Sequence, residues 1–407
     1  MTRPRVLAII QAGGAGSRMD VLTRERAKPA LPFAGIYQLV DFPLSNLAHS
    51  GISEVWLSVQ YQGSTLEQEV ANGRPWDLDR NRGGLRLLMP QEGTGSTDEE
   101  GFARGNADEL YRLRDRIRAA APDALLVMSA DHVYRFDYGD ALATHHEAGA
   151  ACTVVTSEVP LEEAGDHATV EVGDDGTVTG FAYKPEEPTT GTVATEVMVY
   201  DPAVLVTVLE ELHHELGPET PQGDSGLGDF GDHLLPRLVD RHRVVAHALP
   251  GYWRDVGTPE KYLAAHRDLL GEDVDVFDDP AWPMLTRQPQ RPPARVLDGA
   301  VVVDSLVSPG SRIAGTVERS VLGPGVVVEA GAAIRDSVVW PDTVVGAGAT
   351  VDWAIVDERC QIGNDAVVGE KADDLAAEAL CLLGRDARVA AGARVAAGAR
   401  LEPGTTA

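Results

Sequence analysis

The chain has 407 residues, of which 43% are hydrophobic, and a formal net charge of −28. This composition excludes a disordered or fibrous protein and allows two domains, and the negative charge opposes binding to nucleic acid and to anionic membranes. The apolar runs fall short of the roughly 18 to 20 residues of a membrane span, and no signal peptide is recognised. We therefore expect a cytoplasmic protein whose three cysteines, Cys152, Cys360 and Cys381, are small core residues.

A glycine-rich turn follows the first predicted strand, residues 6–10. Glycines allow backbone N–H groups to approach a polyphosphate with no Cβ in the way, and Arg18 and Lys28 would supply positive charge. The spacing matches neither a P-loop nor a dinucleotide-binding turn. We therefore predict a phosphate site of another kind at these glycines, which are Gly13, Gly14 and Gly16.

Lysine is rare in this chain. Only four of the 35 basic residues are lysines, namely Lys28, Lys184, Lys261 and Lys371. An ammonium group is a compact point charge whereas a guanidinium is a flat fork, so a retained lysine indicates a position that needs the smaller group. Each lysine taken by itself could also be a surface residue that was kept by chance and has no functional role. For Lys28 the functional interpretation is favoured, because Lys28 also lies close to the glycine turn.

Strands and helices alternate between residues 5 and 270, which predicts a mostly parallel sheet with helices on both faces. The expected strands are 6–10, 55–59, 85–89, 125–128, 152–156 and 243–249, and the expected helices are 107–119, 138–148, 202–216, 231–240 and 259–270. Ligands of such sheets bind at the carboxyl ends of the strands. Asp131 and Asp255 each follow a predicted strand and are therefore candidate site residues, although each could instead cap a turn.

The C-terminal region has a different period. Residues 271–297 are rich in proline and aspartate and are predicted to be a stiff linker between domains at 1–270 and 298–407. Nine aliphatic residues then step by six within three triplets: Leu322, Val328, Ile334, Val339, Val345, Val351, Val356, Ile362 and Val368. This step is typical of a hexapeptide β-helix, which we expect to be left-handed. An interruption at 371–386 is predicted to be helical, and the pattern then resumes to Leu401.

Eight motifs occur along the chain in this order: GGAGSR at 13–18, AKPA at 27–30, DFPLSN at 41–46, GNAD at 105–108, ADHVY at 130–134, KP at 184–185, DFG at 229–231 and YWRDVGT at 252–258. Together they resemble the motifs of the glucose-1-phosphate adenylyltransferase family of sugar-phosphate nucleotidyltransferases. With the β-helix, the resemblance covers nearly the whole chain. It implies a Rossmann-like nucleotidyltransferase domain and a homotetramer, the family precedent.

The resemblance also implies a reaction, in which ATP and glucose 1-phosphate give ADP-glucose, a precursor of glycogen, and pyrophosphate. The attacking phosphate oxygen is already ionised, so catalysis needs positioning and charge neutralisation rather than a general base. Asp131 and Asp255 match the two Mg²⁺-binding aspartates of the family. Arg18 and Lys28 would hold the β- and γ-phosphates, and Arg18, Lys28 and Asp131 are the predicted catalytic residues.

Other positions are assigned to the two substrates by the same resemblance. Lys184 would hold the sugar phosphate, with Tyr183 and Glu196 beside the sugar. The predicted nucleotide-binding residues are Gly13, Gly14, Gly16, Gln91, Gly105 and Asn106. A glutamine after a proline is also common in ordinary loops, which leaves Gln91 as an open assignment.

The sugar-binding residues depart from the family pattern. Tyr183 stands where the family has glutamate, and Ala194 and Met198 stand where serine and tyrosine are expected. Sugar hydroxyls are read by hydrogen bonds, so these changes remove partners for glucose. Glu196 and Tyr183 could therefore read a different acceptor, such as an amino-sugar or cyclitol phosphate, or they could have no consequence.

Two rival classes of protein are weighed against this interpretation. Acyltransferases with hexapeptide β-helices generally need a histidine base, and no histidine follows His266 in this chain. A silent regulatory subunit tends to lose the arginine of the glycine turn or a metal aspartate, whereas Arg18, Lys28, Asp131 and Asp255 are all present. Both observations favour an active enzyme.

Overall fold

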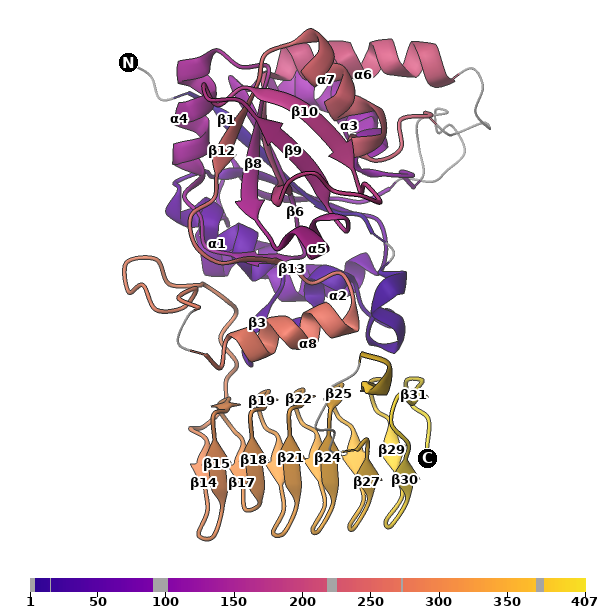
Figure 1. The fold of residues 1–407 in the computed structure, drawn as a ribbon. Helices are drawn as coiled ribbons and strands as arrows, with labels where there is room; N and C mark the ends of the chain where they lie inside the picture. Colours follow the sequence, from indigo (N-terminus) through magenta and orange to yellow (C-terminus); the bar gives the residue numbers. More distant parts are fainter. Residues whose placement is uncertain (1–3, 15, 91–101, 218–224, 272–273, 371–376) are drawn as a thin grey trace, which may run out of the picture.

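The computed structural model describes residues 4–14, 16–90, 102–217, 225–271, 274–370 and 377–407. An N-terminal α/β domain stands on a C-terminal β-helix (Figure 1). The large sheet of the α/β domain has the order β10-β9-β11-β6-β1-β4-β5, and β8 pairs with β11 and β12. Its strands are β1 (Val6–Ala12), β4 (Glu54–Val59), β5 (Gly84–Leu88), β6 (Ala124–Ser129), β8 (Cys152–Glu158), β9 (Ala168–Val172), β10 (Val178–Tyr183), β11 (Thr192–Tyr200) and β12 (Val244–Ala248).

The sheet is parallel in the half that carries the glycine turn. Strand β1 pairs in parallel with β4 and with β6, and β4 pairs in parallel with β5. A strand with parallel neighbours is buried on both faces and needs a continuous apolar sequence, which explains the run at 6–10. Strand β11 runs antiparallel to β6 and β8. The predicted α/β fold is thus confirmed as a mixed sheet whose parallel part positions the glycine turn.

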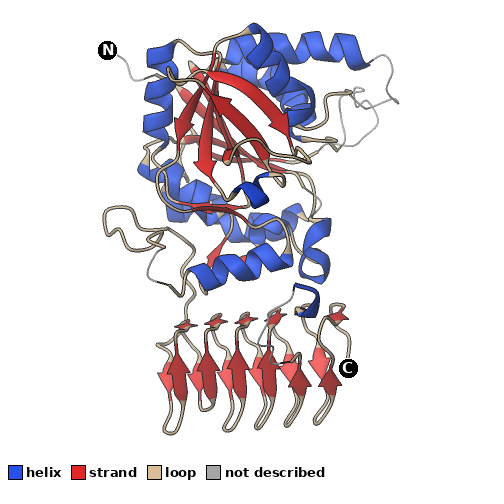
Figure 2. Cartoon of the chain, viewed as in Figure 1, coloured by secondary structure: helices blue, strands red, loops and turns tan. Residues whose placement is uncertain are grey.

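Successive residues of β1 point into two different apolar cores because side chains alternate along a strand. Ile10 belongs to the core on one face and Ile9 to the core on the other. Figure 2 shows helices packed against both faces of the sheet. The helices are α1 (Asp41–His49), α2 (Gly63–Val70), α3 (Asn106–Ala120), α4 (Tyr138–Ala148), α5 (Leu161–Ala164), α6 (Pro202–Leu216), α7 (Leu235–Arg241) and α8 (Pro259–Asp268).

Several elements differ from the sequence-based expectation. The predicted helix at 231–240 is a π-helical turn, η5 (Phe230–Leu234), that continues into α7. Strands β9, β10 and β11 and helices α1 and α2 were not predicted. The three cysteines are buried and free, as expected.

The C-terminal domain consists of three parallel sheets of six strands each, as a triangular prism requires. The sheets run from β14 (Arg295–Val296) to β29 (Arg388–Val389), from β15 (Val301–Val303) to β30 (Arg394–Val395), and from β16 (Leu306–Val307) to β31 (Arg400–Leu401). The nine predicted aliphatic positions lie in its apolar core, which confirms the hexapeptide pattern.

The helical prediction for 371–386 is wrong where it overlaps β28 (Cys381–Leu383). This strand continues the third sheet, in which it pairs with β25 (Ala354–Val356) and β31. Leu383 is buried inside the prism and Leu382 in the apolar cluster between the domains, so burial on both faces of the strand outweighs their helix propensity. A 3-10 turn at Ala377–Ala379 precedes the strand, and residues 371–376 lie outside the described residues.

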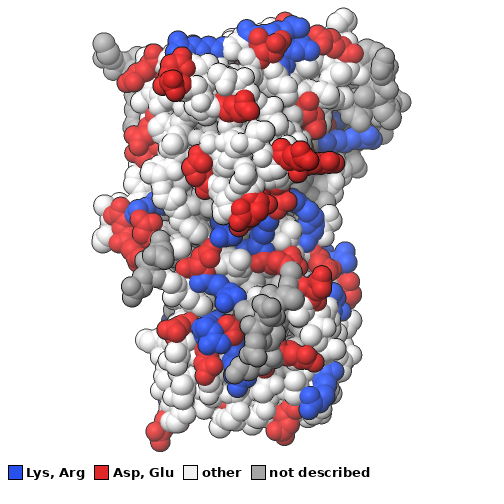
Figure 3. Space-filling model, viewed as in Figure 1, with Lys and Arg blue, Asp and Glu red and all other residues white. Residues whose placement is uncertain are grey.

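The two domains share an apolar cluster that contains Met19 and Phe33 from the first domain and Trp340 and Ile355 from the β-helix. Residues of the predicted linker lie along the first domain. There the Trp282 indole donates a hydrogen bond to Asn46 at 3.0 Å. Acidic side chains are spread over both domains on the face shown in Figure 3. Among the described residues, no helix is both long and apolar enough to cross a membrane.

Candidate active site

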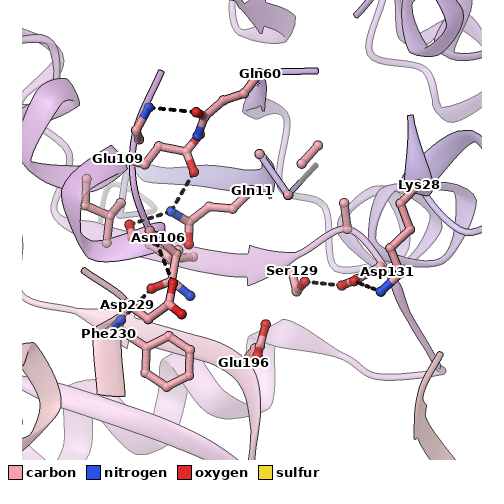
Figure 4. Close-up of a pocket in the computed structure, with 18 of the residues that line it drawn as sticks. Gln11, Lys28, Gln60, Asn106, Glu109, Ser129, Asp131, Glu196, Asp229 and Phe230 are labelled. Carbon is pink, nitrogen blue, oxygen red and sulfur yellow. Dashed lines mark hydrogen bonds and ion pairs between the residues drawn. The ribbon is translucent and has the colours of Figure 1, made fainter. Parts of the chain in front are cut away.

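A polar cavity of about 370 Å³ lies in the α/β domain at the carboxyl ends of β1 and β6 (Figure 4). The predicted residues that line it are Gly13, Gly14, Arg18, Lys28, Gly105, Asn106, Asp131, Tyr183, Lys184 and Glu196. A recess of about 90 Å³ adjoins it and is lined by Asp255 together with several of the same residues. The structure thus brings nearly all the predicted residues together, while Gln91 lies outside the described residues.

The glycine turn leaves β1 and leads into the 3-10 helix η1 (Ser17–Thr23). Gly16 has φ +67°, a left-handed conformation that favours glycine. A Cβ on Gly13 would lie 2.4 Å from the Gln60 amide nitrogen. Gly16 lies in the turn without lining the cavity, and Arg18 is exposed at its mouth.

Lys28 is buried at the start of the 3-10 helix η2 (Lys28–Ala30), and its ammonium group forms an ion pair with Asp131. Ser129 donates a hydrogen bond to the other oxygen of this carboxylate. Burial by itself would raise the pKa of Asp131, but the charges of Lys28 and His132 outweigh it and hold the pKa far below its usual range. Asp131 is therefore ionised at every physiological pH.

Asp255 is brought beside Asp131 by a small antiparallel sheet. Strand β13 (Trp253–Asp255) pairs with β7 (His132–Tyr134), so that Asp255 lies opposite His132. The His132 Nε2 atom lies 3.7 Å from an oxygen of Asp131 and 3.7 Å from an oxygen of Asp255. The two carboxylates therefore flank one imidazole and are separated by less than the sum of these distances.

His132 connects this loop to β11, because its Nδ1 atom donates a hydrogen bond to the Thr195 carbonyl at 3.0 Å. Burial lowers the pKa of His132, but Asp131, Glu196 and Asp255 together raise it above its ordinary value. The imidazole thus lies between acidic groups whose charges favour its protonated form.

The carboxylate oxygens in this part of the cavity fit a hard divalent cation, which prefers oxygen ligands. The possible ligand atoms of Asp131, His132 and Glu196 lie within 4.8 Å of one another. Asp255 is not in this group of three, although it faces the same histidine. The predicted pairing of Asp131 with Asp255 on one ion stays a prediction.

Glu196 lies in an irregular part of β11, where the pairing with β8 shifts register. It has φ +57°, an uncommon conformation for a residue with a side chain. Burial raises the pKa of its carboxyl group. Within the described part of the chain, no hydrogen bond or ion pair is formed by this carboxyl group, which points into the cavity in Figure 4.

Tyr183 lies between the predicted sugar-phosphate residues and the predicted nucleotide-binding turn in the cavity. Its hydroxyl donates a hydrogen bond to Asp229 at 3.0 Å, and the other oxygen of Asp229 accepts one from the Asn106 backbone at 3.2 Å. The Lys184 ammonium lies 4.9 Å from the centre of the Tyr183 ring. Of the predicted sugar-phosphate residues, Tyr183 is thus hydrogen-bonded through Asp229 to the predicted nucleotide turn.

Gly105 is required by a close backbone approach. It has φ +153°, and a Cβ there would lie 2.2 Å from the carbonyl group of Gly228. That carbonyl accepts hydrogen bonds from the backbone of Ala107 and Asp108, each at 3.2 Å. The glycine therefore lets the loop before η5 close one side of the cavity.

The sequence analysis missed several polar residues on the cavity wall, among them Gln11 and Glu109. The Gln11 amide donates hydrogen bonds to Glu109 at 3.0 Å and to the Asn106 carbonyl at 2.8 Å (Figure 4). Burial raises the pKa of Glu109 to about 7. The available signal was a glutamine that interrupts the apolar sequence of β1.

Comparisons with known proteins show which class of protein this chain belongs to. The family model for nucleotidyl transferases matches residues 7–272, and the model for the GlmU-like C-terminal hexapeptide region matches residues 292–379. The molecule is therefore a nucleotidyl transferase with a hexapeptide-repeat domain.

Comparison with individual relatives shows which family within this class the chain belongs to. Glucose-1-phosphate adenylyltransferase of Bacillus licheniformis is 36% identical over 82% of this chain and 85% of its own length. The enzymes of the same name from Clostridium perfringens (35% identical over 83% of this chain and 84% of the relative) and Thermomicrobium roseum (37% over 75% and 69%) are similar to it as well. The chain belongs to the glucose-1-phosphate adenylyltransferase family.

Proposed function

We propose that this protein transfers the adenylyl group of ATP to glucose 1-phosphate, with release of pyrophosphate and formation of ADP-glucose. The observation that carries the proposal is the buried Lys28 ammonium on Asp131, beside a glycine turn at the end of a parallel strand. An ion pair of this kind places a cation for a phosphate next to a carboxylate for a metal ion. Family membership supports the choice of substrates.

The reaction needs no proton acceptor, because the attacking oxygen belongs to an ionised phosphate. In our proposal Lys184 holds the phosphate of the acceptor, while Lys28 and Arg18 neutralise the departing pyrophosphate. Asp131 and Asp255 would hold Mg²⁺, which supplies further neutralisation of the phosphate charge when bound. The glycines and Asn106 would position the nucleotide.

The proposal is tested by measuring pyrophosphate release from each of the four NTPs with glucose, glucosamine, N-acetylglucosamine and mannose 1-phosphates and a cyclitol phosphate. ATP with glucose 1-phosphate should be the leading pair, and ADP-glucose should be the product. Turnover of another pair with none of this one would overturn the substrate assignment. The absence of turnover with every pair would instead favour a regulatory subunit.

The carboxyl group of Glu196 forms no hydrogen bond or ion pair within the described residues, and it favours a second candidate acceptor, an amino-sugar 1-phosphate. A substrate ammonium would give this half-buried carboxylate a direct counter-ion, in addition to the more distant charges of His132 and Lys28. The comparison of glucosamine 1-phosphate with its neutral N-acetyl form isolates the charge. A preference for the amine that disappears in Glu196→Gln, but survives in the exposed Glu187→Gln, would establish this acceptor.

We further propose a cytoplasmic location, a role in glycogen or α-glucan synthesis and a homotetrameric assembly. Family membership supports these assignments, and the absence of a membrane-spanning helix from the described residues is compatible with the location. Light scattering of the purified protein would measure the number of subunits.

A further inference from the structure

A buried ion pair joins the two domains only two residues before Lys28 in the sequence. The Arg26 guanidinium lies 2.6 Å from a carboxylate oxygen of Asp357, a residue of the β-helix. The two side chains are 3% and 2% exposed. A second acidic side chain, that of Glu358, lies 3.7 Å from the same guanidinium nitrogen.

The Asp357 end of this pair is fixed by the β-helix. Asp357 directly follows β25, and its backbone N–H donates a hydrogen bond to the Leu383 carbonyl of the next coil at 2.9 Å. Its carbonyl accepts a hydrogen bond from the Thr343 hydroxyl at 2.9 Å, and its carboxylate accepts one from the Glu358 backbone at 2.7 Å. The carboxylate is therefore presented from a rigid coil.

The Arg26 end lies in the segment between η1 and η2, which connects the glycine turn to Lys28. Two residues of chain span at most about 7 Å, so a shift of Arg26 is transmitted to Lys28 almost directly. The next backbone N–H, that of Ala27, is held by the Thr65 hydroxyl at 3.0 Å. The Arg26 side chain is thus the buried contact of this segment with the β-helix.

Other ion pairs between the domains are of a different kind. Arg24 contacts Glu402 at 3.2 Å and Arg400 contacts Asp20 at 3.2 Å, but these side chains are all between 31% and 53% exposed. Exposed pairs contribute little because water screens them and their long side chains lose entropy. Removal of one partner from a buried pair, by contrast, leaves a charge without compensation, and the segment must move to hydrate it.

We infer that Asp357 positions Lys28 through Arg26, so that the β-helix domain takes part in adenylyl transfer. This inference rests on the proposed function. Arg26 and Asp357 are positioning residues, since neither lines the cavity that Lys28 reaches. The loss of their contact should affect the steps in which Lys28 meets the triphosphate and leave acceptor binding intact.

The test compares Asp357→Asn, which keeps the shape of the side chain and removes its charge, with the wild-type protein. We expect kcat for pyrophosphate release to fall about tenfold to hundredfold, or KM for ATP to rise by as much, with KM for glucose 1-phosphate unchanged. Asp357→Glu should recover part of the loss. The matched control is Glu402→Gln, which breaks the exposed pair with Arg24 and should leave all three constants unchanged.

A double-mutant cycle with Lys28→Met separates positioning from a general loss of structure. If Asp357 acts through Lys28, Asp357→Asn should reduce kcat little further once Lys28 is gone. Equal fold-reductions in both backgrounds would overturn the inference, as would wild-type kinetics for Asp357→Asn. If that variant does not fold, Arg26→Lys takes its place in the same cycle, with the same two outcomes. A wild-type protein without turnover would contradict the proposed function itself.

Discussion

Replacement of Lys28 by methionine removes the buried counter-ion of Asp131 and keeps an unbranched side chain of similar length. Removal of one partner of a fully buried ion pair costs about 3 to 5 kcal/mol. The Asp131 side chain is 22% exposed and faces the cavity, so water offsets part of this cost. We therefore expect Lys28→Met to lower the free energy of unfolding by about 2 kcal/mol.

The same variant should lose activity for a separate reason. A single well-placed donor to a developing anionic charge contributes about 10²-fold to 10³-fold to kcat, and the Lys28 ammonium is the proposed donor to the departing pyrophosphate. The kcat for pyrophosphate release from ATP and glucose 1-phosphate should fall by this factor. Lys28→Arg keeps the charge but introduces a larger, planar group into a buried site, and it should also be impaired.

The double variant Lys28→Met/Asp131→Asn distinguishes the two effects. Asp131→Asn removes the carboxylate that Lys28→Met leaves uncompensated, so urea denaturation should show most of the lost stability restored. Activity should stay low, because neither phosphate nor metal ion finds its charged partner. A Lys28→Met variant whose kcat stays within threefold of wild type would refute the assignment of Lys28 to the phosphates.

Three further predictions follow from particular contacts. Gly105→Ala should abolish turnover and lower the melting temperature, because its Cβ would lie 2.2 Å from the Gly228 carbonyl group. Tyr183→Phe removes the hydrogen bond to Asp229 and should lower kcat/KM for the sugar phosphate about tenfold in the pyrophosphate assay. Burial raises the pKa of Asp41 from 3.8 to about 8, so the folded protein binds a proton that the unfolded chain has released between these values, and the contribution of Asp41 to stability falls as pH rises through this range. Asp41→Asn should flatten that slope when urea midpoints are compared at several pH values.

The parts of the fold that could be predicted are those with a local signal. Strand β1 has a continuous apolar sequence that ends in glycines, and each coil of the β-helix repeats an aliphatic residue at a fixed step. Strands β9 to β11 carry no such signal, because β-propensity depends on the neighbours that pairing brings together. Cys381–Leu383 was misassigned for the same reason, since a short apolar segment suits a helix or a strand until its partners are known.

In the candidate site, too, some features could be predicted from the sequence and others could not. The motifs predict that Lys28, Asp131 and Lys184 act on the same pair of substrates, and the three side chains line one cavity. The contact of Arg26 with Asp357 could not be predicted, because it joins positions 331 residues apart and no local pattern in the sequence pairs the two residues. The positive φ of Glu196 could not be predicted either, because among the residue types glycine is the one that indicates such a conformation in a sequence.

The dependence of pyrophosphate release on the acceptor tests the central claim most directly. In a single displacement at the α-phosphorus, an oxygen of the sugar phosphate must be present before pyrophosphate can leave. The purified protein with ATP should therefore release pyrophosphate only when glucose 1-phosphate is added, in equal amount to the ADP-glucose formed. Release of pyrophosphate without any acceptor, or its persistence at wild-type rate in Asp131→Asn, would contradict the account.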